Sequence, residues 1–180
     1  MMEIFASSLL SHSPSPSGID IAVTKHPYFV DKSKSIEESR EYGSSGVEQV
    51  HLIGFDTLTR LLDTKYYPPE HRLGSLVPFL EKHRLLVTYR TDDKWGSREE
   101  QDAYIKAIAD GELDGVGGKK EWVGEGRIRM VEGRKEGEEV ISSTKVREAV
   151  KNGDKAALKG LVTDGVAEYV LDEGLYLKDD

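Results

Sequence analysis

The chain has 180 residues, a formal net charge of -8 and no cysteine, so disulfide scaffolds, thiolate metal sites and cysteine nucleophiles are excluded. The length suits one domain that buries a core without the help of metals or disulfides. The acidic balance argues against a general nucleic-acid binder, because neutralising phosphates requires a basic surface.

The hydropathy pattern favours a soluble protein that does not act at a membrane. No apolar run approaches the roughly 20 residues that a transmembrane helix needs. The start of the chain, MMEIFASSLLSHS, lacks the basic segment of a secretory signal. The absence of cysteine also fits a reducing compartment. We therefore expect a cytoplasmic location, with the nucleus as an additional candidate.

Helical and strand patterns alternate along the first half of the sequence. Apolar residues that recur on one face predict helices, and period-2 alternation or β-branched runs predict strands. Clusters of proline, serine and glycine mark the loops. In chain order we predict a helix in 2–11, a loop in 11–18, a strand in 19–24, a loop in 25–32, a strand in 47–55, a helix in 56–63, a helix in 73–83 and a strand in 84–90.

The second half continues the alternation and ends in helices. Strands that alternate with helices indicate an α/β domain with a largely parallel sheet. The sequence shows no repeat and no linker, so we expect a single domain over residues 1–180. The remaining predictions are an amphipathic helix in 97–111, a strand in 127–131, a short strand in 138–144 and three closing helices, with Gly153 and Gly174 at C-terminal cap positions.

The first junction of interest is LIGFDTLTRL, where the strand in 47–55 meets a helix. Ligands of open α/β sheets bind at the carboxyl ends of the strands. Gly54 lets the backbone approach a ligand closely, and Asp56 can accept hydrogen bonds from ribose hydroxyls or an adenine amino group. The simpler interpretation is that Asp56 is an ordinary helix N-cap after a flexible glycine.

The second junction is EEVISSTKVREAV, in which Ser142, Ser143 and Thr144 open a helix. Lys145 and Arg147 lie in its first turn, where the helix dipole disfavours cations. A bound phosphate would make these cations favourable, since free N–H groups and a forked guanidinium both suit an anion. The simpler interpretation is a capped surface helix with solvated cations.

These motifs carry a resemblance to a known family. ISSTKVR matches the ISSTxxR signature of the nucleotidyltransferase superfamily. With VEQVHLIGFDTLTRL before it and LVTDGVAEYVLDEGLY after it, the chain resembles the nicotinamide mononucleotide adenylyltransferases of fungal type. The resemblance implies a Rossmann-like nucleotidyltransferase domain with a mostly parallel sheet and C-terminal helices.

The implied reaction joins ATP and nicotinamide mononucleotide to give NAD and pyrophosphate, without a covalent enzyme intermediate. Mg²⁺ would accompany the ATP. By the resemblance, Gly54 and Asp56 would hold the adenosine part. Ser142, Ser143, Thr144 and Arg147 would hold the β- and γ-phosphates, whereas the role of Lys145 is not assigned because its position in the motif is variable.

Further residues are candidates for the nicotinamide mononucleotide side. By family order, Thr24 and Lys25 would shape that pocket, although a surface loop is the simpler interpretation. Trp95 follows the strand in 84–90 and can stack on a nicotinamide ring, and Arg90 beside it can meet a phosphate. Trp122 is a second candidate, but a tryptophan is more often a core residue. The sequence shows no metal-ligand cluster.

The chain departs from the family at one motif. The family carries an H-x-G-H turn after its first strand, and no two histidines of this chain have that spacing. By the resemblance, the first strand, its phosphate-binding turn and the first helix are expected to be missing. We therefore predict little adenylyltransferase activity for these 180 residues, and no catalytic side chain is assigned.

Two other functions stay open at this point. One is a non-catalytic nucleotide-binding or interaction module derived from the family. The other is a nucleotidyltransferase that uses a different phosphate acceptor, such as a phosphopantetheine or a phosphocholine. Product formation separates the first from an enzyme, and substrate competition separates the second.

Overall fold

The computed structural model describes residues 1–12, 18–39, 41–42, 46–90, 93–133 and 141–177. The chain forms two compact units. We call Lys25–Glu138 the sheet unit, and Met1–Thr24 together with Glu139–Asp180 the helical unit. The single nucleotidyltransferase-like domain over residues 1–180 stays a prediction.

The sheet unit is built on a parallel sheet. Its strands are β1 (Val50–Gly54), β2 (Arg84–Thr88) and β3 (Ile128–Val131), in the spatial order β1-β2-β3. Both strand pairs are parallel, with Ile53 opposite Val87 and Leu85 opposite Ile128. The predicted α/β class with a parallel sheet is therefore confirmed, as are the strands predicted in 47–55, 84–90 and 127–131.

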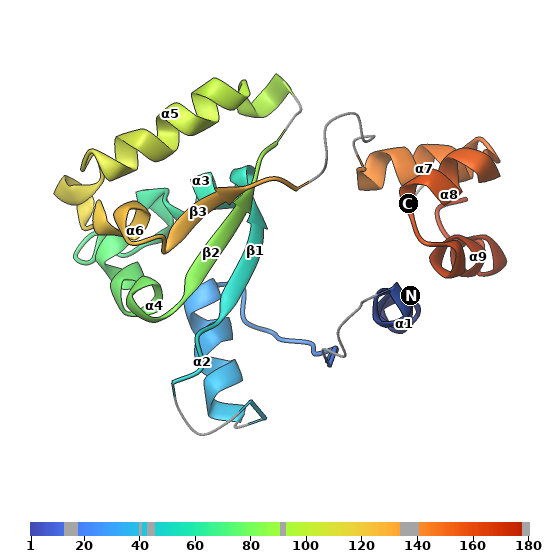
Figure 1. Ribbon diagram of the computed structural model, residues 1–180, viewed down its shortest axis with the longest axis horizontal. Coiled ribbons are helices and arrows are strands. Elements are labelled where there is room, and N and C mark those ends of the chain that lie inside the picture. The colour runs from blue at the N-terminus through green and yellow to red at the C-terminus, as the bar shows by residue number, and fades with distance from the viewer. Residues whose placement is uncertain (13–17, 40, 43–45, 91–92, 134–140, 178–180) are drawn as a thin grey trace. The chain divides into compact units, whose positions relative to one another are not determined.

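One face of this sheet forms the core of the unit. Side chains alternate between faces along a strand, so Ile53 is buried while its neighbour Leu52 is 74% exposed. Figure 1 shows α3, α4, α5 and α6 gathered on the same side of the strands. The buried core residues of the unit are Ile53, Phe55, Leu58, Leu61, Leu62, Leu73, Leu76, Phe79, Leu80, Leu85, Val87, Ile108, Trp122 and Ile128.

The helices of the sheet unit follow the predictions in part. The helix predicted in 73–83 divides into a 3₁₀ segment and α4, with Pro78 in the first turn of α4, where its missing N–H costs nothing. Helix α5 begins with a capping box of Ser97 and Glu100 and is followed by Gly111 at φ 94°. The bounds are α2 Phe29–Ser39, α3 Phe55–Leu61, η1 Thr64–Tyr66, η2 Arg72–Leu76, α4 Val77–Lys82, η3 Asp93–Trp95, α5 Arg98–Ala109, η4 Asp114–Val116 and α6 Glu121–Gly124.

The helical unit joins the two ends of the chain. It contains α1 (Met2–His12), α7 (Ser143–Lys151), α8 (Lys155–Leu161) and α9 (Asp164–Asp172). Ile4 of α1 packs against the small core of this unit. The predicted caps are confirmed, because Gly153 and Gly174 follow α7 and α9 with φ values of 67° and 60°. The buried core residues are Ala149, Val150, Leu158, Leu161, Val166, Ala167 and Val170.

Two predictions of local structure are wrong. Residues 19–24 are not a strand, since alternating apolar residues need a partner strand and no ladder among the described residues includes them. The loop predicted in 25–32 ends early because α2 already begins at Phe29. The strand predicted in 138–144 falls largely outside the described residues, and so does most of the loop predicted in 11–18.

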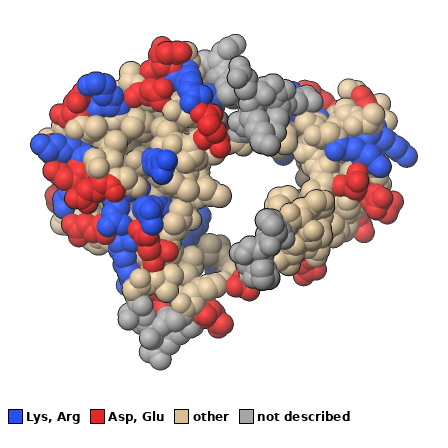
Figure 2. Space-filling view, viewed as in Figure 1, with Lys and Arg blue, Asp and Glu red and all other residues tan. Residues whose placement is uncertain are grey.

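The surface carries charges of both signs. Figure 2 shows acidic and basic side chains interspersed over the visible face of the sheet unit. None of the helices in the described parts of the chain is long and apolar enough to cross a membrane.

Candidate functional site

The first candidate site lies at the junction of β1 and α3. Strand β1 ends at Gly54, which is the N-cap of α3 with φ -87° and ψ 160°. The next residue, Phe55, is buried and fixes the start of the helix in the core. Asp56 therefore lies in the first turn of α3, and its side chain is 16% exposed.

The carboxylate of Asp56 is paired within the sheet unit. Arg90, just beyond the end of β2, donates a hydrogen bond from Nε to Asp56 Oδ1 over 2.6 Å. This hydrogen bond is the largest cause of a lowered Asp56 pKa, and partial burial opposes it. Asp56 is thus an ionised hydrogen-bond acceptor at neutral pH.

Gly54 matters at this junction for the space it leaves. A Cβ at position 54 would lie 2.5 Å from Asp56 Oδ1 and 3.2 Å from Arg90 Nε. Its φ is one that any residue adopts, so conformational freedom is not the reason for glycine here. The interpretation of Asp56 as the N-cap is wrong, because Gly54 holds that position.

Gln101 belongs to this arrangement although its role was not predicted from the sequence. It is fully buried in α5 and exchanges hydrogen bonds with the backbone N–H and C=O of Arg90. The signal was present, since Gln101 occupies the same helix stripe as Tyr104, Ile105 and Ile108. A polar residue in an apolar stripe needs internal hydrogen-bond partners.

The second candidate site is the start of α7 in the helical unit. Ser142 is the N-cap, and its hydroxyl accepts a hydrogen bond from the Lys145 N–H over 3.2 Å. Ser143, Thr144 and Arg147 are exposed, so their polar groups are accessible to an anion. The guanidinium carbon of Arg147 lies 5.7 Å from the centre of the Tyr176 ring.

The other predicted residues are placed differently. Thr24 and Lys25 are exposed in a segment without regular structure. Trp95 is partly buried and packs against the core of the sheet unit, as the simpler interpretation requires. Trp122 is 2% exposed and is a core residue. The structure thus brings Gly54, Asp56 and Arg90 together in one unit and Ser142–Arg147 together in the other.

No metal ligands gather at these junctions within the parts of the chain that the structure describes. A search of those residues finds no group of at least 3 histidine, aspartate or glutamate side chains that could hold a metal ion. The Asp56 carboxylate already accepts from Arg90. A Mg²⁺ ion would therefore have to be bound mainly by the phosphates of a nucleotide and by water.

Comparison with known proteins finds one informative similarity. No family model matches the chain. A protein of Schizosaccharomyces pombe (strain 972 / ATCC 24843), described as "Putative nicotinamide mononucleotide adenylyltransferase", is 30% identical over 152 residues. The aligned part is 84% of this chain and 57% of the relative, so the chain spans little more than half the length of the protein it matches.

Proposed function

We propose that the chain belongs to the nicotinamide mononucleotide adenylyltransferase family and takes part in forming NAD and pyrophosphate from ATP and nicotinamide mononucleotide. The observation that carries this proposal is the 30% identity over 152 residues with a relative described by that activity. The parallel sheet and the two helix starts support the same function.

In the sheet unit, Asp56 would receive the adenosine part of ATP. Its lowered pKa keeps the carboxylate ionised, and the lone pairs not used by Arg90 would accept from ribose hydroxyls or the adenine amino group. The missing side chain at Gly54 leaves room at the carboxyl end of β1, where open α/β sheets bind their ligands.

In the helical unit, the start of α7 would receive the β- and γ-phosphates. Backbone N–H groups of a helix start, the hydroxyls of Ser143 and Thr144 and the guanidinium of Arg147 all donate to phosphate oxygens. Ser142 would help indirectly, since its hydroxyl caps the helix by accepting from Lys145 N–H. A bound phosphate would offset the unfavourable position of the two cations near the positive end of the helix.

The chemical step would require little covalent work from the protein. A phosphate oxygen of nicotinamide mononucleotide attacks the α-phosphorus of ATP, and the bond to the pyrophosphate oxygen breaks. Positioning and charge neutralisation supply the rate enhancement. Mg²⁺, bound with ATP, would neutralise part of the phosphate charge. Thr24, Lys25, Trp95 and Arg90 are proposed on the acceptor side.

A second candidate function is a non-catalytic nucleotide-binding module. The observation that favours it is the absence of any histidine pair with H-x-G-H spacing in these 180 residues. Such histidines would stabilise the reacting phosphates. We therefore expect these residues alone to bind ATP with little NAD formation.

A combined binding and turnover assay tests both functions. ATP affinity is measured by calorimetry with Mg²⁺ present, and NAD formation is followed after adding nicotinamide mononucleotide. Binding without product supports the non-catalytic module, and turnover near about one per second supports the enzyme. A protein that binds neither substrate would overturn both. Competition by phosphopantetheine would reveal a different acceptor.

A further inference from the structure

We infer that Gln101 is a positioning residue for the nucleotide site, since it fixes the backbone at Arg90 and so holds the guanidinium that orients Asp56. The inference rests on the proposed function only for the identity of the ligand. Its structural part concerns three side chains of the sheet unit, contributed by α5, the end of β2 and the start of α3.

The amide of Gln101 binds Arg90 as a neighbouring strand would. Its Nε2 donates to the Arg90 carbonyl over 2.6 Å, and its Oε1 accepts from the Arg90 N–H over 3.1 Å. The same Nε2 also donates to the Gly96 carbonyl over 3.2 Å. Because Gln101 is fully buried, these bonds are shielded from water and losing them leaves buried polar groups unsatisfied.

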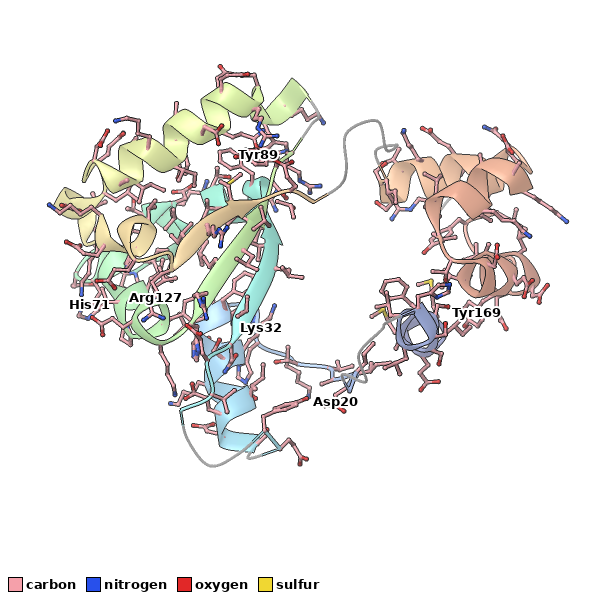
Figure 3. All side chains as sticks on the ribbon, viewed as in Figure 1. Asp20, Lys32, His71, Tyr89, Arg127 and Tyr169 are labelled. Carbon is pink, nitrogen blue, oxygen red and sulfur yellow. The ribbon has the colours of Figure 1, made fainter. Side chains whose placement is uncertain are left out.

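Further contacts tie the end of β2 to the first turns of α5. The Tyr89 hydroxyl donates to Asp102 Oδ1 over 2.5 Å, and the Arg98 guanidinium carbon lies 4.2 Å from the centre of the Tyr89 ring. Figure 3 shows Tyr89 next to α5. Arg98 also forms an ion pair with Glu132, which follows β3. The backbone that carries Arg90 is therefore held from both sides of its attachment to Gln101.

The fixed backbone determines where the Arg90 side chain can reach. Its Nε donates to Asp56 Oδ1 over 2.6 Å, close to the space that Gly54 leaves empty of a Cβ. A hydrogen bond from Nε sets a direction as well as a charge, because the guanidinium is planar and its donors are fixed. Asp56 is thus held in one orientation before any ligand arrives.

A purely structural role for Gln101 makes a different prediction. If Gln101 only satisfied buried backbone groups, its loss would lower stability without changing the carboxylate of Asp56. If it positions Arg90, the loss also weakens the Arg90–Asp56 hydrogen bond. The pKa of Asp56, followed by carboxyl NMR without nucleotide, separates the two roles.

The test uses the full chain with substitutions at three arginine or glutamine positions. Gln101→Met removes the amide at similar volume, and Gln101→Glu keeps the shape and the acceptor but loses the donor. Arg90→Gln removes the charge, whereas Arg90→Lys keeps it without the forked donors. Arg60→Gln is the matched control, since Arg60 is exposed on α3 and acts on Asp56 only through its charge.

We expect Gln101→Met and Arg90→Gln to raise the Asp56 pKa toward its ordinary value and to weaken ATP binding roughly tenfold. Arg90→Lys keeps the pKa low yet still weakens binding, because orientation is lost. Arg60→Gln changes both quantities little. If Gln101→Met does not fold, Gln101→Glu gives the same readouts.

Two outcomes are decisive in different ways. Folded Gln101 variants with an unchanged Asp56 pKa and unchanged ATP affinity would overturn the positioning role. A wild-type chain that does not bind ATP overturns the proposed function instead, while the response of the Asp56 pKa still decides whether Gln101 positions the pair.

Discussion

At the start of α3 the key charged side chain is already paired inside its unit, whereas at the start of α7 it lies on the surface. Asp56 is mostly buried and accepts from Arg90 over 2.6 Å. Arg147 is exposed, and its described contact is with the face of the Tyr176 ring. One helix start is organised before a ligand binds, and the other presents cations that an anion would neutralise.

The packing below the two helix starts differs in the same direction. Phe55 and Leu58 fix α3 in the extensive core of the sheet unit, while Ala149 and Val150 attach α7 to a smaller cluster of short helices. Substitutions at the α3 start should therefore change stability and binding together. Substitutions at the α7 start should change binding and leave stability nearly intact.

The largest expected effect comes from Arg147→Ala. Loss of charge-assisted hydrogen bonds to phosphate should weaken ATP binding about 10- to 100-fold, as expected for about 1.5–3 kcal/mol. The free energy of unfolding should change by less than about 1 kcal/mol, because only an exposed cation–π contact is lost. Calorimetric titration with ATP and thermal unfolding measure the two quantities.

Lys155→Ala is the matched control for Arg147→Ala. Lys155 opens α8 in the same unit, where Asp154 caps the helix by accepting from the Ala157 N–H over 2.9 Å. Removal of this cation should leave ATP affinity unchanged. Equal losses of affinity in both variants would mean that general positive charge, rather than the α7 start, attracts the nucleotide.

Gly54→Ala should reduce stability and binding together. The new Cβ would lie 2.5 Å from Asp56 Oδ1, so the carboxylate and Arg90 must move. We expect a loss of about 1–3 kcal/mol in unfolding free energy and a higher Asp56 pKa. Chemical denaturation and carboxyl NMR measure these changes. Gly74→Ala is the control, because a Cβ at position 74 meets nothing within 4 Å, and an equally destabilised control would refute the steric explanation.

The difference between the two helix starts could be predicted only in part from the sequence. The motif around Gly54 and Asp56 and the hydroxyl run at Ser142 were located correctly as helix starts. The pairing of Asp56 with Arg90 was not predicted, since it joins residues 34 positions apart on adjacent parallel strands. Periodicity reports which face of an element is buried, but it does not report which long-range partner a charge finds.

The regular elements show the same limit. The helix predicted in 97–111 was correct because its capping box and apolar stripe are local signals. The polar helix α2 was missed, since it is held by distant contacts such as Ser33 with His51 and Glu37 with His83. The strand expected in 19–24 was wrong because a strand exists only when a partner is present.

A pH effect should distinguish the two units. His51 and His83 in the sheet unit have pKa values lowered from 6.5, mainly by burial. The unfolded chain then binds protons more readily than the folded one, so unfolding free energy falls as pH drops below about 6.5 and levels off below the folded pKa values. Hydrogen exchange of each unit between about pH 5 and 7 measures this slope.

The charged neighbours of the two histidines define the control. Glu37 and Glu48 raise the pKa of His83, Lys82 lowers it, and Lys32 lowers that of His51. The pKa of Glu37 is itself lowered, so its own destabilising protonation belongs to the more acidic range below 4.5. His51→Gln should flatten the slope above about pH 5. A helical unit with the same slope as the sheet unit would contradict the assignment to these histidines.

The smallest expected effects come from two glycines in the helical unit. Gly160 lies inside α8 with nothing within 4 Å of an added Cβ, so Gly160→Ala should raise unfolding free energy by up to about 1 kcal/mol. Gly165 opens α9 against α1, and its added Cβ would lie 2.8 Å from Ile4 Cγ2. Gly165→Ala should therefore lose about 1 kcal/mol. Thermal unfolding of both variants decides whether α1 packs on α9 in solution, because two alanines with equal stabilising effects would mean that Ile4 does not occupy this contact.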